Sequence, residues 1–141
     1  MVYLLDNNVV SELRKPRPRG AVVAWRRSIP LHQLAVPAVV VAEIQAGIEI
    51  TRLRDAAKAD ELEKWLDGVM SYYTILPADG MIYREWARLM HGRSENLAAD
   101  AMIAATARVL RLIVATQNVK DFKPFNVEIY NPFDYAREEG N

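Results

Sequence analysis

The alternation of short apolar runs with longer amphipathic segments constrains the fold more than any other feature of this sequence. The short runs are rich in Val, Ile and Leu and end at Asp, Asn, Pro or a turn, which is typical of buried strands. We expect strands at residues 2–5, 34–36, 74–76, 112–115 and 127–130, and helices at 22–29, 38–53, 55–70, 79–90 and 97–110. Strands that alternate with helices predict an α/β fold, in which helices cover both faces of a central parallel sheet of about five strands.

The size and composition of the chain point to one ordinary globular domain. A chain of 141 residues fits a single domain, and no repeat, low-complexity stretch or linker divides residues 1–141. The sequence has no cysteine, which excludes disulfides, thiolate nucleophiles and cysteine-ligated zinc. The first residues lack the basic start of a signal peptide, and the longest apolar runs are far short of the ~20 residues that span a bilayer. We therefore expect a soluble, cytoplasmic protein with no membrane partner.

The charge balance argues against nucleic-acid binding by net charge alone. The chain carries 18 lysines and arginines against 18 aspartates and glutamates, so its formal net charge is zero. Proteins that bind nucleic acids through charge alone are usually strongly basic. If this chain binds RNA, it must use a local basic patch or bound cations.

Four acidic residues from distant parts of the chain are expected to meet at one edge of the sheet. Asp6 directly follows the first strand, and Asp121 follows the fourth strand by a few residues. Glu43 and Asp100 lie in the first turns of helices that begin at the same edge. In open parallel sheets, ligands bind at the carboxyl ends of the strands. These four carboxylates are therefore candidate catalytic or metal-binding residues.

The expected surroundings of Glu43 and Asp100 strengthen the case for a bound cation. Both share a helix face with apolar residues, and an unpaired carboxylate on such a face would cost several kcal/mol. The apolar neighbours are Val39, Val40, Ala46, Gly47 and Ile50 for Glu43, and Leu97, Ile103, Ala104 and Ala107 for Asp100. A divalent cation with oxygen ligands would offset the cost. Arginine partners would also satisfy these two residues, and helix capping would explain the other two acids taken singly.

Four motifs, in order along the chain, resemble the signatures of the PIN-domain ribonucleases. They are residues 4–12 (LLDNNVVSE), 40–47 (VVAEIQAG), 99–107 (ADAMIAATA) and 115–122 (ATQNVKDF), the last followed by Asn131, Pro132 and Phe133. The likeness spans essentially the whole chain. It is greatest to the VapC and FitB-like branch, the toxins of toxin–antitoxin pairs.

The resemblance implies a three-layer α/β/α PIN fold and cleavage of RNA that depends on Mg²⁺ or Mn²⁺. The matched acids, Asp6, Glu43, Asp100 and Asp121, would be the catalytic and metal-binding set. The resemblance also implies a cognate VapB/FitA-like antitoxin, a homodimer, and a hetero-oligomer with the antitoxin on DNA. We expect the antitoxin to insert a basic side chain, an arginine, into the acidic pocket, where a bidentate charged pair is favoured.

The segment 38–70 adds a physical reason for a dimer. Its two long helices offer more apolar surface than one small sheet should need to cover. The residues that provide this surface are Ile44, Ile48, Leu53, Leu62, Trp65 and Leu66.

Two positions depart from the usual pattern of the family. Asn7 stands where most relatives carry threonine, so the role of that position is open. In some relatives the fourth acid falls at the position of Asn118, whereas here it falls at Asp121. We expect Asp121 to supply the fourth negative charge of the site and Asn118 to supply a supporting hydrogen bond. Asn8 and Thr116 are further supporting residues.

Metal-assisted hydrolysis of a phosphodiester gives each acid a role. Asp6 and Asp100 would hold the cation, and Glu43 would bind it or act as a general base. Asp121 would hold a second ion or orient the first through water. A basic loop follows a short helix that we expect to begin at Asn8, and it either guides the RNA backbone or is a solvated, flexible connector. Its charged residues are Arg14, Lys15, Arg17 and Arg19.

Two other classes of protein share parts of this pattern. The run Leu4 to Val9 resembles the opening of haloacid-dehalogenase-like phosphatases, but Asn8 cannot serve as their acidic proton donor. A non-enzymatic, receiver-like Mg²⁺-binding module would need a phospho-acceptor aspartate after the third strand. Asp79 is the only nearby candidate, and its position predicts a helix cap.

Overall fold

A single sheet of five parallel strands forms the centre of the computed structural model, which describes residues 1–135. The strands are β1 (Tyr3–Leu5), β2 (Leu34–Pro37), β3 (Thr74–Leu76), β4 (Ile113–Ala115) and β5 (Ile129–Tyr130). They lie in the order β3-β2-β1-β4-β5, and every neighbouring pair is parallel. The predicted α/β class and the parallel five-stranded sheet are confirmed.

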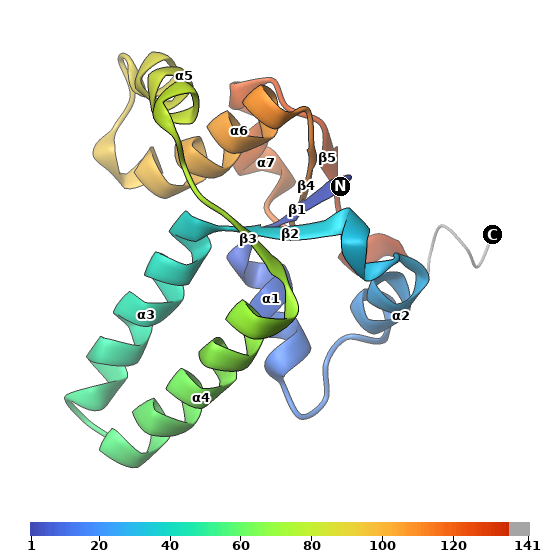
Figure 1. Ribbon diagram of the computed structural model, residues 1–141, viewed down its shortest axis with the longest axis vertical. Helices are drawn as coiled ribbons and strands as arrows, with labels where there is room; N and C mark the ends of the chain where they lie inside the picture. Colours follow the sequence, from blue (N-terminus) through green and yellow to red (C-terminus); the bar gives the residue numbers. More distant parts are fainter. Residues whose placement is uncertain (136–141) are drawn as a thin grey trace.

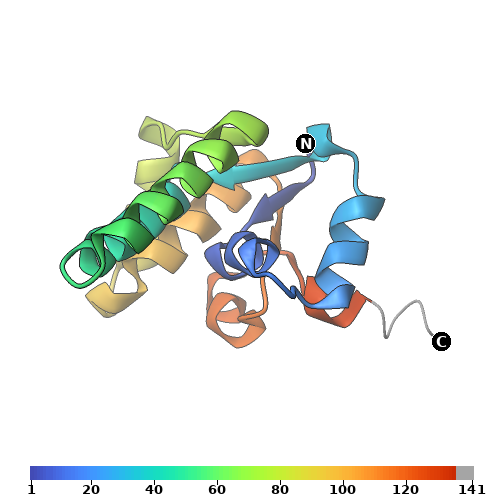
Figure 2. The same cartoon turned by 90° about the horizontal axis from the view of Figure 1, so that it is seen from below.

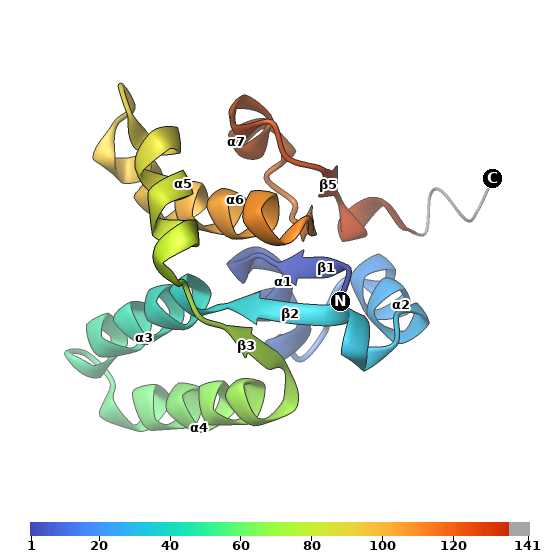
Figure 3. The same cartoon turned by 45° about the horizontal axis from the view of Figure 1, so that its top comes forward.

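Helices connect the strands and cover the sheet. The α-helices are α1 (Asn7–Arg14), α2 (Gly20–Ser28), α3 (Ala38–Arg52), α4 (Ala56–Tyr72), α5 (Gly80–Met90), α6 (Ala98–Leu110) and α7 (Val119–Phe122). Short 3-10 turns are η1 (Leu31–Gln33), η2 (Glu95–Leu97), η3 (Lys123–Phe125) and η4 (Pro132–Asp134). Figure 3 shows α5 and α6 on one side of the sheet and α3 and α4 on the other, so the molecule has three layers.

The helix starts follow local capping chemistry. Asp55 accepts a hydrogen bond from the backbone N–H of Lys58, and Asp79 accepts one from that of Ile82, both at 3.0 Å. These aspartates therefore precede α4 and α5 as caps, one residue before the first helical residue of each. The cap at Asp79 also removes the candidate phospho-acceptor of a receiver-like module.

The order of the strands creates a crevice at the carboxyl ends of β1 and β4. The chain passes from β1 to β2 and β3 in one direction, and then crosses to β4 and β5 on the other side of β1. Right-handed crossovers in opposite directions place their helices on opposite faces, which leaves the edge open between the two central strands. The backbone N–H of Asp6 donates to the carbonyl of Ala115 at 3.0 Å and joins the two strand ends.

The α3–α4 pair extends beyond the carboxyl ends of the strands (Figures 1 and 2). The prediction that this pair leaves surplus apolar surface is wrong for three of the six residues named. Ile44, Ile48 and Leu66 are buried within the chain, because α3 and α4 pack along each other. Leu62 and Trp65 are half-buried, and Leu53 alone among the six is strongly exposed, at 88%.

The described helices also bear on the question of a membrane span. Across residues 1–135, no helix combines the length and the apolar character that crossing a bilayer requires.

Candidate active site

Asp6 stands at the end of β1 and is held by several hydrogen bonds. Its Oδ1 accepts the backbone N–H of Asn7 at 2.7 Å, so the side chain caps α1. Its Oδ2 accepts the hydroxyl of Thr116 at 2.7 Å and the side-chain amide of Asn8 at 3.1 Å. The Oδ1 atom of Asn8 accepts the backbone N–H of Gln117 at 3.1 Å. These bonds tie the start of α1 to the turn that follows β4.

The pKa of Asp6 is raised above its ordinary value, although three hydrogen bonds favour the charged form. Burial is the largest cause, because only 5% of the residue is exposed. The bonds from Thr116, the backbone of Asn7 and the amide of Asn8 lower the pKa, and the negative charge of Asp121 raises it again. Burial outweighs the hydrogen bonds, so a nearby positive charge would favour ionised Asp6.

Glu43 lies in the second turn of α3 with one carboxylate oxygen buried and unpaired. Its Oε1 has no hydrogen-bond partner among residues 1–135. Burial, followed by the negative charges of Asp6 and Asp100, raises the pKa of Glu43 to about 7. The prediction of which residues share the apolar face of α3 with Glu43 was partly wrong, because the buried residues of this helix are Val40, Ile44 and Ile48. Ile50, expected beside Glu43 in the core, is 60% exposed.

Asp100 lies in the first turn of α6, as the sequence predicted, and faces the same charges. Burial, followed by the charges of Asp6 and Asp121, raises its pKa to about 6. Asp121 lies on the short helix α7 and is exposed. None of the ion pairs in the described part of the chain involves Glu43 or Asp100. The arginine partners considered from the sequence are therefore not present there.

A cavity of about 320 Å³ opens between these acids. Its walls are Asp6, Asn7, Asn8, Ser11, Glu43, Asp100 and Asn118. Three of the four predicted acids line it, whereas Asp121 does not, although its negative charge raises the pKa values of Asp6 and Asp100. The hydrogen bond that ties Asn118 to the site comes from its backbone N–H, which donates to Thr116 Oγ1 at 3.0 Å.

The chemistry of these walls suits a hard divalent cation. The cavity offers carboxylate and amide oxygens, which are the ligands that Mg²⁺ and Mn²⁺ prefer. The unpaired Oε1 of Glu43 and the raised pKa values of Glu43 and Asp100 reflect negative charge that the chain does not offset. Within residues 1–135, no three acidic or histidine side chains are grouped closely enough to enclose an ion by themselves. The residues fit an ion that takes its remaining ligands from water or substrate, as Mg²⁺ commonly does.

Asn7 and Ser11 line the cavity but were not selected from the sequence as site residues. Ser11 lies one helical turn after Asn7, and its hydroxyl donates to Asn7 Oδ1 at 2.7 Å. With Glu43, both residues also line a neighbouring groove of about 270 Å³ between α1, α3 and α4. The spacing of four residues on a helix that starts beside Asp6 is the signal that could have identified them.

The basic loop between α1 and α2 is held in place by Glu12. The side chain of Glu12 is only 8% exposed and pairs with Lys15 Nζ at 2.9 Å. Its other oxygen accepts the backbone N–H of Arg19 at 2.9 Å. The hydrogen bond from Lys15 is the main cause of a lowered pKa at Glu12. Glu12 therefore ties the loop at both ends, while Lys15, Arg17 and Arg19 stay exposed to solvent.

The four predicted RNA-binding residues of this loop lie in different places. Arg14 lines the groove beside the acids, and its guanidinium lies 5.6 Å from the ring centroid of Trp65. Arg19 lies 5.8 Å from the ring of Phe133, and Arg17 is exposed. Arg14 is therefore the member of the set nearest to the acidic cavity.

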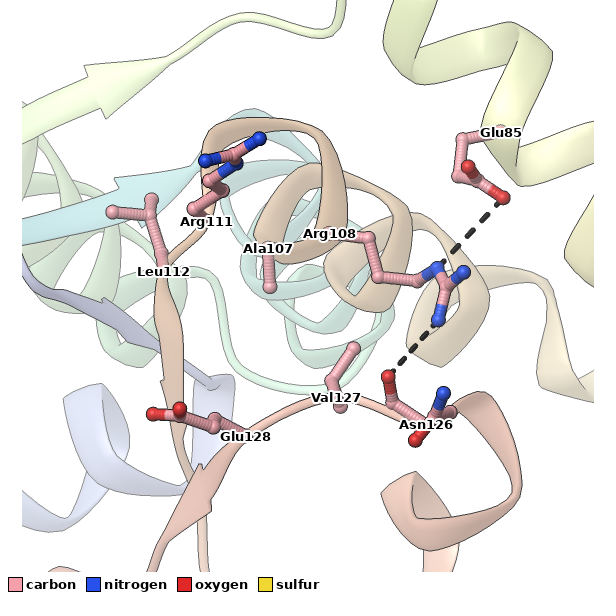
Figure 4. Close-up of a pocket in the computed structure, with 8 residues that line it drawn as sticks. All are labelled: Glu85, Ala107, Arg108, Arg111, Leu112, Asn126, Val127 and Glu128. Atoms are coloured by element: carbon pink, nitrogen blue, oxygen red, sulfur yellow. Dashed lines mark hydrogen bonds and ion pairs between the residues drawn. The ribbon is translucent and has the colours of Figure 1, made fainter.

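A second cavity, of about 360 Å³, lies at the opposite edge of the sheet, and some of its lining residues bind one another (Figure 4). Arg108 of α6 donates to the backbone oxygen of Asn126 at 2.9 Å and approaches Glu85 of α5 at 3.8 Å. Arg111 and Leu112, at the amino end of β4, also line this cavity. Because the guanidinium of Arg108 is already bound within the chain, we assign this cavity a structural role.

Comparison with known proteins gives the family. The PIN domain matches residues 3–124. Toxin FitB of Neisseria gonorrhoeae is 35% identical in an alignment of 140 positions that covers 94% of this chain and 99% of FitB. The VapC ribonuclease Y4jK of Sinorhizobium fredii is 31% identical in an alignment of 142 positions that covers 96% of this chain and 100% of Y4jK. The chain belongs to the PIN-domain family and is similar to its VapC and FitB members.

A solved structure supports the same assignment. FitAB bound to the IR36 DNA fragment superposes with a TM-score of 0.80 at 32% identity, over 94% of this chain and 96% of that chain. The three-layer PIN fold predicted from the motifs is confirmed.

Proposed function

We propose that this chain is the toxin of a VapBC-type toxin–antitoxin pair and a divalent-metal-dependent endoribonuclease. The observation that carries the proposal is a cavity lined by Asp6, Glu43 and Asp100 in a PIN-domain protein, with the charge of Asp121 close enough to raise the pKa of Asp100. The names of the relatives FitB and Y4jK support a toxin and a ribonuclease. In this proposal residues 1–141 act as one PIN domain. Because the proposed substrate is RNA, we place the protein in the cytoplasm.

Each acid has a defined part in the proposed reaction. Asp6 and Asp100 hold Mg²⁺ or Mn²⁺, and Thr116 and Asn8 orient the carboxylate of Asp6. When bound, the cation lowers the pKa of water and offsets charge on the phosphate oxygens. Glu43 either ligates the cation or accepts a proton, since a pKa of about 7 suits a general base near neutral pH. Asp121 holds a second ion or orients the first through water.

RNA binding in this proposal depends on a local basic site, because the chain has no net charge. Four acids at one edge repel RNA until a cation offsets them. Arg14 lies in the groove that shares Asn7, Ser11 and Glu43 with the acidic cavity, so it is the first candidate to contact the RNA backbone. Lys15, Arg17 and Arg19 are weaker candidates on the same loop.

The proposed partner is a VapB/FitA-like antitoxin. The chain forms a homodimer, and the dimer joins the antitoxin in a hetero-oligomer on DNA, which the FitAB–DNA structure supports by similarity. The antitoxin inhibits by inserting an arginine into the cavity, where the guanidinium pairs with the carboxylates that line it. An antitoxin that inhibits fully while leaving the acidic cavity open would contradict this mode of inhibition.

The test is cleavage of RNA by purified protein with and without a divalent cation. We expect cleavage with Mg²⁺ or Mn²⁺ and none in EDTA. We expect Asp6→Asn and Asp100→Asn each to lower the cleavage rate at least 100-fold, which corresponds to roughly 3 kcal/mol of lost transition-state stabilisation. Asp67→Asn, on the exposed side of α4, makes the same chemical change away from the cavity and should cleave as the wild type does. Undiminished cleavage in EDTA, or by both site variants, would falsify the proposal.

A further inference from the structure

The side chain of Asn7 has a fixed orientation in the acidic cavity. Its Oδ1 accepts the hydroxyl of Ser11 at 2.7 Å, one helical turn further along α1. This bond points the other end of the amide, Nδ2, away from Ser11. The residue is half-buried and lines both the acidic cavity and the neighbouring groove.

The amide Nδ2 of Asn7 is a hydrogen-bond donor on a wall made mainly of acceptors. The carboxylates of Asp6, Glu43 and Asp100 accept hydrogen bonds and cannot donate them when ionised. The amide of Asn8 already donates to Asp6 and Thr116. Among residues 1–135, Asn7 Nδ2 makes no hydrogen bond of its own, and Asn7 lines the cavity.

The orientation of this amide distinguishes a donor from a cation ligand. An asparagine binds a hard cation through its carbonyl oxygen, and one of the two lone pairs of this oxygen already accepts the hydroxyl of Ser11. The amide nitrogen, Nδ2, can instead donate a hydrogen bond to a negatively charged oxygen. A phosphate of RNA presents such an oxygen, and a bond from a neutral amide to a charged oxygen is stronger than one between neutral groups.

We infer that Asn7 Nδ2 donates a hydrogen bond to a phosphate oxygen of the bound RNA, and that Ser11 is the residue that positions it. The inference rests on the proposed ribonuclease function and assigns Asn7 to substrate binding within that same site. Asn118 also carries an amide at the cavity, but its side chain is exposed and belongs to the turn after β4. Asn7 therefore has the more restricted geometry.

The test separates RNA binding from metal binding and from folding. Wild type, Asn7→Ala, Asn7→Gln and Ser11→Ala would be compared on a single-stranded RNA oligonucleotide carrying a fluorophore and a quencher, with Mn²⁺. We expect Asn7→Ala to raise KM about tenfold while kcat changes less than about threefold, as the loss of one charge-assisted bond implies. Asn7→Gln keeps a donor and should restore part of the loss. Ser11→Ala should raise KM less, and the double variant should match Asn7→Ala.

Calorimetric titration with Mn²⁺ and thermal melts complete the experiment. Asn7→Ala should bind Mn²⁺ as the wild type does, and Ser71→Ala, on the exposed end of α4, should match the wild type in every measurement. The inference is overturned if Asn7→Ala has the KM of the wild type, or if it weakens Mn²⁺ binding. If the wild type itself cleaves no RNA, the proposed function fails and the Asn7 variants have no bearing on that failure.

Discussion

Glu43 keeps a buried carboxylate oxygen without a partner, so ionising it costs the metal-free protein stability. Its pKa is about 7 in the folded chain and near the ordinary 4.5 when unfolded. Because the folded value is the higher one, the contribution of Glu43 to stability is fully present below about pH 4.5. It is lost as the pH rises through about 7.

Replacing Glu43 by glutamine should remove this pH dependence, because glutamine stays neutral. We expect the metal-free Glu43→Gln variant to equal the wild type at pH 4 and to exceed it by about 1 kcal/mol at pH 8, after discounting for solvent at a half-buried site. Denaturant unfolding at several pH values measures this difference. Glu128→Gln, an exposed change, should track the wild type throughout. A constant offset for Glu43→Gln at all pH values would contradict this account.

Asp100 allows the proposed metal site to be tested without RNA. With a pKa of about 6 it is mostly ionised at pH 7.5, and it makes no ion pair within residues 1–135. We expect Asp100→Asn to melt higher than the wild type in EDTA, and to gain less from Mn²⁺. A ligand at about 100 times its dissociation constant stabilises the wild type by ~2.7 kcal/mol. A variant that is less stable in EDTA and responds fully to Mn²⁺ would place Asp100 in a structural role.

At the scale of elements, the connection from α1 to α2 depends on one buried acid. Glu12 binds Lys15 through one oxygen and the backbone of Arg19 through the other. The residues of the loop carry most of the proposed basic contacts, so Glu12 sets where those charges stand. Exposed ion pairs contribute little to stability, whereas a bond to a backbone N–H holds the chain itself.

Glu12→Ala should therefore destabilise the protein by about 1–2 kcal/mol at pH 7, and Lys15→Ala by about 0.5 kcal/mol or less. The pKa of Glu12 is lowered, so its contribution is present above the ordinary value of 4.5 and is lost as the pH falls through the folded value. Urea unfolding of the two variants and the wild type at pH 7 and below pH 4 measures these losses and their pH dependence. Equal losses in the two variants would show that the ion pair, not the backbone bond, anchors the loop.

At the scale of the molecule, the proposed dimer needs an apolar surface, and the α3–α4 pair offers less than its sequence indicated. A larger apolar cavity, about 630 Å³, lies between α3, α5 and α6. Tyr83 and Trp86 line it, and Tyr83 is 53% exposed. Contiguous exposed apolar surface of this kind commonly marks an interface.

We expect a homodimer at micromolar concentration by light scattering, and a monomer for Tyr83→Arg, because a charge cannot be buried unpaired in an apolar contact. Leu53→Arg, at the exposed end of α3, makes the same kind of change elsewhere and should remain a dimer. A monomeric wild type would contradict the dimer. Dissociation by Leu53→Arg alone would place the interface on the α3–α4 pair instead.

Local pattern was sufficient to locate the elements and most of the acids. Periodicity and caps placed the strands and the longer helices, and Asp6, Glu43 and Asp100 follow strands or begin helices at one edge of a parallel sheet. Short α7 and the 3-10 turns escaped prediction, because three or four residues carry no periodicity. Their absence from the expected pattern left the surroundings of Asp121 unspecified.

The remaining features depend on how the elements pack. Asn8 meets Thr116 across 108 positions of the chain, and no local pattern encodes that hydrogen bond. The rotation of α3 against α4 decides which of its faces is buried, and so which atoms of Glu43 lose their contact with water. The placement of Asn118, rather than Asp121, in the cavity wall has the same origin. Spacing along the chain places a residue on an element, whereas only packing against distant elements sets which way its side chain points and what it meets.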